Sequence, residues 1–143
     1  MAVVGKHATI ISRSGTTVDV GAFTPDYKPF VAEVVDAAIQ YDCPYSNKTI
    51  IGVLRNAIEV PSMNNNLLPP FMLREAGITV STTPKIHVNN PGVEDHSIFF
   101  PETGQRIPLS LTGVFSYFPT SKPTRETMNS CEDIYETCQL EIR

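Results

Sequence analysis

The chain has 143 residues, of which 41% are hydrophobic, and a net charge of −4; that length suits one domain with a single core. Its 11 Lys and Arg residues are outnumbered by 15 Asp and Glu residues, so a basic surface that binds nucleic acid is not expected. No apolar run reaches the about 18 residues of a membrane span, and no basic, apolar leader is present, so we predict no membrane segment and a cytoplasmic location.

The first third of the chain predicts β-hairpins. Residues 8–12 (ATIIS) and 16–23 (TTVDVGAF) are rich in β-branched residues, and the turn-forming run Arg13-Ser14-Gly15 separates them. Residues 30–41 (FVAEVVDAAIQY) fit a helix at positions 31, 34, 35 and 38, and a strand at positions 35, 37, 39 and 41. The flanking turns favour the strand. Residues 48–54 (KTIIGVL) then complete a second hairpin.

The stretch from Asn56 to Leu68 reads NAIEVPSMNNNLL, which predicts a strand that ends, turns and begins again. Pro61 has no N–H to donate, so it ends the strand. Residues 62–66 are turn-forming because Asn tolerates the left-handed backbone. Leu67 and Leu68 are then expected to return to the core.

This stretch also carries a family resemblance. AIEVPSMNNNLLPP (residues 57–70) is similar to the VLYVP-x-L-x-x-NLLS signature of copia-type retroelement polyproteins, which lies in their aspartic protease region. VVGKHA (residues 3–8) resembles the strand that follows the catalytic Asp loop of that family. LREAG (residues 73–77) resembles the short helix after NLLS. The resemblance extends to about Thr124 and implies a retropepsin-like fold.

The resemblance places the catalytic Asp-Ser/Thr-Gly loop just before Val3, where this sequence has only Met1 and Ala2. The expectation is therefore an aspartic-protease-like domain that is truncated and catalytically inactive. By the same resemblance the active enzyme would be a homodimer, each subunit lending one Asp, and would cut peptide or polyprotein segments, in the cytoplasm or in a virus-like particle. Two alternatives stay open: a non-catalytic β scaffold or protein-interaction module, and a small β-barrel ligand-binding protein.

Two short strings imitate protease motifs. Asp19-Val20-Gly21-Ala22 looks like Asp-Ser/Thr-Gly-Ala, but Val20 lacks the hydroxyl that would join two active-site loops by hydrogen bonds. We therefore expect Asp19 to be a solvent-facing strand residue. Ile50-Ile51-Gly52 resembles a later apolar-apolar-Gly motif, but it comes before the NLL element. Its glycine predicts a β-bulge instead.

The second half of the chain predicts short elements. Residues 71–76 form a helix that Gly77 ends, and strands are expected at residues 78–81, 85–88, 97–100, 105–111 and 114–118. His87 alternates with apolar residues in KIHV and should point away from them. Glu94-Asp95-His96 offers too few ligands for a metal, so a solvated loop is expected. His7 has no accompanying nucleophile motif and is expected at the surface.

The aromatic residues near the C-terminal end are predicted to form a core or an interface patch; they are Phe99, Phe100, Phe115, Tyr117 and Phe118. Residues 119–123 read as a Ser/Thr/Pro linker, and Thr124 can cap a helix over residues 125–131. Residues 132–143 are expected to be a strand or a mobile tail. The predicted division is a β domain over residues 1–118 and a linker and tail over residues 119–143.

Cys43, Cys131 and Cys138 form no C-x-x-C pair, so free thiols are expected rather than a zinc site or a disulfide framework. No residue is predicted to be catalytic, to bind a cofactor or to bind a metal. The predicted fold is mainly β: a small, partly open barrel of hairpins with one or two short helices.

Overall fold

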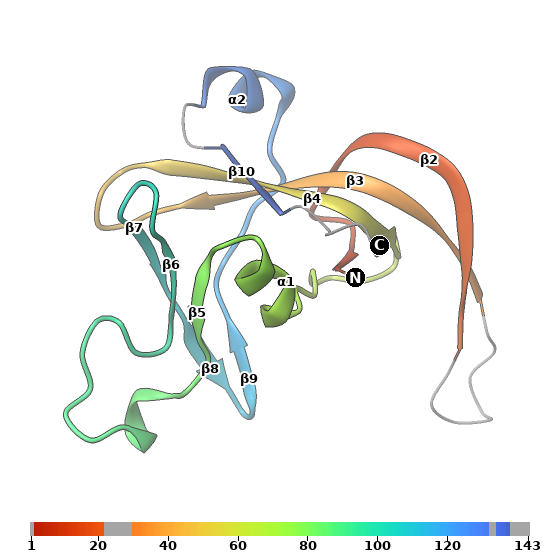
Figure 1. Ribbon diagram of the computed structural model, residues 1–143. Coiled ribbons are helices and arrows are strands. Elements are labelled where there is room, and N and C mark those ends of the chain that lie inside the picture. Colours follow the sequence, from red (N-terminus) through yellow and green to blue (C-terminus); the bar gives the residue numbers. More distant parts are fainter. Residues whose placement is uncertain (1, 22–29, 132–133, 138–143) are drawn as a thin grey trace.

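The computed structural model describes residues 2–21, 30–131 and 134–137 of the chain (Figure 1). The strands are β1 (Val3–Val4), β2 (Thr9–Val20), β3 (Phe30–Asp42), β4 (Thr49–Glu59), β5 (Thr79–Ser81), β6 (Ser97–Phe100), β7 (Gln105–Pro108), β8 (Ser110–Thr112), β9 (Phe115–Tyr117) and β10 (Ile134–Thr137). The helices are α1 (Pro70–Glu75), the 3₁₀ turn η1 (Lys85–His87) and α2 (Arg125–Ser130). The prediction of a mainly β chain with two short helices is confirmed, and the sheets of the described part stay open rather than closing into a barrel.

The main sheet has the order β1-β4-β3-β2, and β10 also pairs with β4. Both β1 and β10 run parallel to β4 and share its outer edge, with Val3 opposite Ile58 and Tyr135 opposite Gly52. A strand from the predicted C-terminal tail thus belongs to the main sheet. The antiparallel sheet β5-β6-β7 and the hairpin β8-β9 form two smaller sheets beside it.

Both faces of the main sheet are covered at its centre. Helix α1 and the small sheets lie on one side of it, and α2 lies on the other (Figure 1). Along β3, the residues at positions 35, 37, 39 and 41 are buried in the two larger core clusters, which confirms the strand predicted from that alternation. On the opposite face, Ala38, Ile51 and Val53 pack against Met128 and Cys131 of the α2 segment.

Two of the predicted helix signals, Gly77 after α1 and Thr124 before α2, are confirmed. Pro70 starts α1, and Gly77 follows it with a φ of 86°, the left-handed conformation that glycine adopts at low cost. The side chain of Thr124 caps α2 by accepting a hydrogen bond of 3.2 Å from the amide of Thr127. This cap satisfies one of the helix's free N–H groups.

The hairpin predicted around residues 13–15 is wrong. Strand β2 continues through Gly15, which has a φ of 75°, and pairs with β3 on both sides of it, from Thr9 to Arg13 and from Thr17 to Val20. Register shifts between Ile10 and Ser12, and between Arg13 and Thr17, absorb the extra residues. The glycine signal therefore marks a bulge in an edge strand, because β3 is long enough to pair on both sides of it.

The bulge predicted at Gly52 is also wrong. The pairing of β3 with β4 is regular there, and the register shifts between Val35 and Ala37 instead. Asn56 lies opposite that shift with a φ of 52°, and its amide donates a hydrogen bond of 3.0 Å to Oδ1 of Asp36. Asn tolerates this conformation better than most residues, and the Asp36 carboxylate satisfies the displaced amide.

Two other strand predictions need correction. The strand predicted over residues 85–88 is wrong: residues 85–87 form η1, because Pro84 starts a turn in which the amide of His87 donates to the Pro84 carbonyl. The predicted strand 105–111 divides at Leu109 into β7 and β8. The amide of Leu109 donates to the carbonyl of His96, one residue beyond the last β6-β7 pair, and the chain then enters β8.

Candidate functional site

The segments that carry the family resemblance meet around β1. Residues 2–6 lie between β4 and residues 63–67, and we call this arrangement the β1 junction. The amides of Ile58 and Val60 donate to the carbonyls of Ala2 and Val4, each at 2.9 Å. On the other side of β1, Val3 and Leu67 exchange two backbone hydrogen bonds of 2.9 and 2.7 Å. Strand β1 is thus paired along both edges.

Gly5 and Asn66 close the β1 junction. The amide of Gly5 donates to Oδ1 of Asn66 at 2.8 Å, and the next amide, that of Lys6, donates to the Met63 carbonyl at 3.0 Å. A Cβ atom at Gly5 would overlap the carbonyl oxygen of Met63. The glycine is therefore required by the close approach of two backbone segments.

The two leucines that follow the Asn-rich turn have different roles. Leu68 packs against both larger core clusters, as predicted. Leu67 contributes its main chain to β1, but its side chain is 54% exposed. The prediction that both leucines return to the core is correct for Leu68 and wrong for Leu67, because the strand period of two turns neighbouring side chains to opposite sides.

The core cluster beneath the β1 junction is built from small residues. Ala2, Val4, Ala37 and Ala57 are fully buried in it. The β1 junction therefore supplies tightly packed backbone and apolar atoms.

Asp19 lies on β2, exposed to solvent, directly opposite Val31 of β3. An aspartic protease needs two carboxyl groups close enough to share a proton. The cross-strand neighbour of Asp19 is apolar, so the sheet does not provide the second carboxyl at that position. This placement fits the expectation of a solvent-facing strand residue.

A pair of carboxylates that the sequence did not reveal lies nearby. Glu33 and Glu59 are directly opposite each other on β3 and β4. Arg13 bridges them, with Nη1 at 2.7 Å from Glu33 and 2.8 Å from Glu59. Its hydrogen bonds to Glu59 and then Glu33 raise the pKa of Arg13 above its ordinary value. The guanidinium holds both carboxylates, so this cluster is an ion-pair network rather than a proton-sharing dyad.

The expected solvated loop at residues 94–96 is wrong for its histidine. His96 is buried, with a φ of 55°, and its Nε2 atom is 2.7 Å from Oγ of Ser116. Asp95 accepts a hydrogen bond from the amide of Gly92 instead of joining the histidine. The left-handed turn directs the imidazole inward, where it links this loop to the β8-β9 hairpin. Among the described contacts the imidazole has no carboxylate to orient it, so a Ser-His catalytic arrangement is incomplete.

The remaining candidate residues lie apart from one another. His7 and His87 are exposed. Cys43 is a free thiol, the Sγ atom of Cys131 donates to the Thr49 carbonyl at 3.1 Å, and Cys138 lies outside the described residues. The hydroxyl of Ser46, followed by nearby backbone N–H groups, lowers the pKa of the Cys43 thiol. Within residues 2–21, 30–131 and 134–137, no three His, Cys, Asp or Glu side chains are grouped to hold a metal ion.

An apolar cavity of about 50 Å³ lies between the main sheet and the small sheets. Ile39, Gly52, Phe100 and Tyr135 are part of its lining. The Tyr135 ring stacks on that of Phe100 with 4.0 Å between centroids, and its hydroxyl donates to Oε1 of Gln105 at 2.6 Å. Binding pockets for small molecules are larger, about 300–1,000 Å³, so this cavity is a packing defect in the core.

Comparison of the chain with protein-family models, with curated proteins and with solved structures gave no match. No helix in the described part of the chain is long and apolar enough to cross a membrane. A proposal about function therefore rests on the geometry described above and on the resemblance of the sequence motifs.

Proposed function

We propose that this chain is a retropepsin-like domain of a copia-type retroelement polyprotein that serves as a non-catalytic β scaffold. The observation that carries the proposal is the contact between the two segments that resemble the family. VVGKHA and AIEVPSMNNNLL are far apart in sequence, yet they form the β1 junction, where Gly5 bonds to Asn66 across 61 positions. A chance likeness of two short strings would predict no contact between them.

The chemistry of the described carboxylates supports the non-catalytic part of the proposal. Aspartic proteases activate water with two carboxyl groups that share a proton, because like charges in contact push one pKa upward. Asp19 faces the apolar Val31, and the opposed pair Glu33 and Glu59 is bridged by Arg13. Neither arrangement has the geometry of a proton-sharing dyad.

The alternative of a ligand carrier has one feature in its favour, the apolar cavity beside Tyr135. Its volume of about 50 Å³ is several times smaller than a typical ligand pocket. We therefore favour the scaffold.

The proposal is tested by incubating the chain with an unfolded protein substrate at mildly acidic pH, with and without pepstatin. We expect no pepstatin-sensitive cleavage. Pepstatin-sensitive cleavage that Asp19→Asn abolishes would overturn the non-catalytic assignment, because it would show that the exposed Asp19 supplies the missing carboxyl group.

A further inference from the structure

Strand β10 lies at the edge of the main sheet and pairs with β4. It contributes four residues, Ile134–Thr137, and runs parallel to β4 along residues 51–54 (Figure 1). Among the described strands, none pairs with the outer side of β10. Parallel pairing is slightly less stable per residue than antiparallel pairing, so this short ladder by itself holds β10 only weakly.

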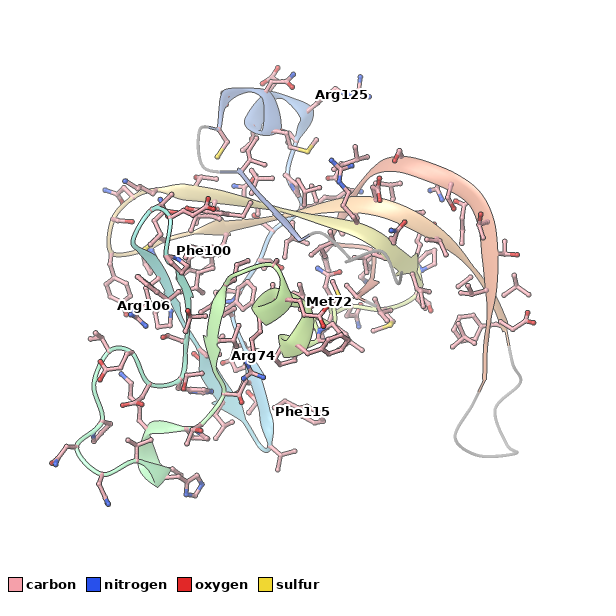
Figure 2. All side chains as sticks on the ribbon, in the orientation of Figure 1. Met72, Arg74, Phe100, Arg106, Phe115 and Arg125 are labelled. Carbon is pink, nitrogen blue, oxygen red and sulfur yellow. The ribbon has the colours of Figure 1, made fainter. Side chains whose placement is uncertain are left out.

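One side chain of β10 anchors the strand. The Tyr135 ring stacks on Phe100 with 4.0 Å between centroids, and Phe100 lies at the end of the β6-β7 hairpin nearest the main sheet (Figure 2). The Tyr135 hydroxyl donates to Oε1 of Gln105 at 2.6 Å and contacts Oγ1 of Thr103. Gly52, opposite Tyr135 in the ladder, presents no side chain beside the ring. Ring and hydroxyl are thus received by four residues that we call the tyrosine socket: Gly52, Phe100, Thr103 and Gln105.

Strand β10 leaves empty space around the tyrosine socket. The apolar cavity of about 50 Å³ borders Tyr135 and Gly52, and a surface hollow of about 180 Å³ lies beside Ile134, Tyr135 and Glu102. Protein interiors normally hold few voids larger than a water molecule, and a void costs its lining atoms their dispersion contacts. The native strand therefore fills this part of the structure less closely than a segment with larger side chains beside its tyrosine would.

Charge also disfavours the native strand at this position. Residues 132–137 read EDIYET, so three of the six are acidic, in a chain whose net charge is −4. The hollow beside Tyr135 is lined by a further acidic residue, Glu102. Like charges brought together raise the free energy, whereas complementary charges steer and select a partner. A segment with Lys or Arg in place of the acidic residues suits this edge better.

We propose that residues 51–54 of β4 and the tyrosine socket form a binding site for an extended basic segment of another protein that carries a tyrosine. Strand β10 occupies the site in the absence of that segment, as an internal competitor. Extended segments add to a sheet edge through main-chain hydrogen bonds, while pockets for alternate side chains give specificity. Here the main chain of β4 supplies the bonds and the tyrosine socket supplies the specificity.

A second copy of this chain is a poor occupant of the site. Its own β10 carries the same acidic residues and comes with a second net charge of −4, so it gains nothing from charge over the strand already bound. The native strand is also tethered, which gives it an effective concentration of the order of millimolar. An outside segment must therefore bring better charge or better packing to displace β10. This inference does not depend on the retroelement ancestry proposed above.

Fluorescence anisotropy of labelled peptides with the full chain tests the proposal. The probe is KKIYKT, the sequence of residues 132–137 with lysine in place of its three acidic residues. Tyr135→Ala removes the anchor of β10, so it should bind KKIYKT at least about tenfold more tightly than the native chain. Tyr117→Ala removes an exposed tyrosine of β9, outside the site, and should bind as the native chain does. The unchanged peptide EDIYET should bind Tyr135→Ala more weakly than KKIYKT.

The tyrosine hydroxyl of the peptide gives a second readout. With the Tyr135→Ala chain, KKIFKT should bind about fivefold more weakly than KKIYKT, because it lacks the hydroxyl that bonds to Gln105. This difference should shrink in the Tyr135→Ala/Gln105→Ala chain. KKIAKT has no ring for the tyrosine socket and should show no saturable binding.

Circular dichroism of each variant separates a lost site from a lost fold. If Tyr135→Ala does not keep the native spectrum, Tyr135→Phe takes its place, since it keeps the ring and removes only the hydroxyl bonds; it should still bind KKIYKT more tightly than the native chain. A natively folded variant that does not bind KKIYKT would overturn the proposal. So would equal binding of KKIYKT and KKIAKT, or an EDIYET peptide that binds at least as tightly as KKIYKT.

Discussion

The amide of Gly5 donates a hydrogen bond to Oδ1 of Asn66, 2.8 Å away and 61 positions later in the sequence. This bond fixes the Asn-rich turn against the first strand, and the backbone pairing of Val3 with Leu67 follows beside it. The side chain of Asn66 therefore helps to position Leu67 and Leu68, where the chain returns toward the core. The β1 junction should be sensitive to changes at either residue.

Asn66→Ala should lower the free energy of unfolding by about 1 kcal/mol, because it leaves the half-buried Gly5 amide without its acceptor. Asn66→Asp keeps an oxygen in place and should cost less. Urea denaturation measures both variants, and Asn65→Ala, at an exposed position of the same turn, is the matched control. Equal effects of Asn65→Ala and Asn66→Ala would show that the hydrogen bond contributes nothing.

Gly5→Ala should destabilise the fold by about 1–3 kcal/mol, because the added methyl group overlaps the Met63 carbonyl and forces two backbone segments apart. Gly21→Ala is the control, since a Cβ atom there meets nothing within 4 Å. The difference between the two urea midpoints reports the cost of the close approach. A Gly5→Ala variant with the same urea midpoint as the native chain would contradict the close approach of the two backbone segments in the β1 junction.

Gly52→Ala should raise the free energy of unfolding, whereas Gly5→Ala should lower it. Gly52 lies between Ile39 and Tyr135 in the sheet, and a Cβ atom there would be 3.4 Å from Cγ1 of Ile39, at the wall of the cavity. The methyl group fills free space and removes the entropy cost of a strand glycine, so we expect a gain of about 0.5–1 kcal/mol. Thermal unfolding checks this, and a lower midpoint would show that the cavity cannot accept the methyl group.

The carboxylate of Asp36 should make stability depend on pH. The hydrogen bond from the Asn56 amide, helped by the side chains of Arg55 and Ser12, holds the pKa of Asp36 below its ordinary value of 3.8. The stabilisation is therefore complete above that value and is lost as the pH falls through the lower pKa of the folded state. The stability difference between the native chain and Asp36→Asn should be constant near neutral pH and should shrink below about pH 4. A difference that does not change with pH would exclude this role.

Local signals predicted several elements well. The turns that flank residues 30–41 favoured the strand β3 over a helix, Pro61 marked the region where β4 ends, and Gly77 marked the end of α1. The Thr124 cap was also correct. Each of these signals acts through its own backbone or immediate neighbours, so the sequence alone is sufficient to detect it.

The errors arose where a distant strand decides the local structure. Gly15 looks like a hairpin turn, but pairing with β3 makes it a bulge. Asn56 takes the left-handed conformation because Asp36 accepts its amide. His96 turns inward because Ser116 lies within hydrogen-bonding distance. None of these partners is close in sequence, so no local pattern could have identified them.

The candidate site was predictable in part. The missing hydroxyl at Val20 argued against a catalytic Asp19, and Asp19 is exposed on β2, as predicted. The ion pairs of Arg13 with Glu33 and Glu59 depend on the register of β2, β3 and β4. A hairpin at residues 13–15 was predicted instead of a continuous β2, so this register could not be derived from the sequence. Tyr135 belongs to a segment with no clear periodicity, and its role follows from stacking on Phe100.

The most direct test of the proposed scaffold is to place an Asp-Ser-Gly-Ala-Asp segment before Val3 and to measure cleavage of an unfolded protein at mildly acidic pH. If the β1 junction is a protease scaffold, this variant should gain pepstatin-sensitive cleavage, and the same segment with Asn in place of its first Asp should not. A variant that keeps the native urea transition but shows no pepstatin-sensitive cleavage at any concentration tested would contradict the proposal.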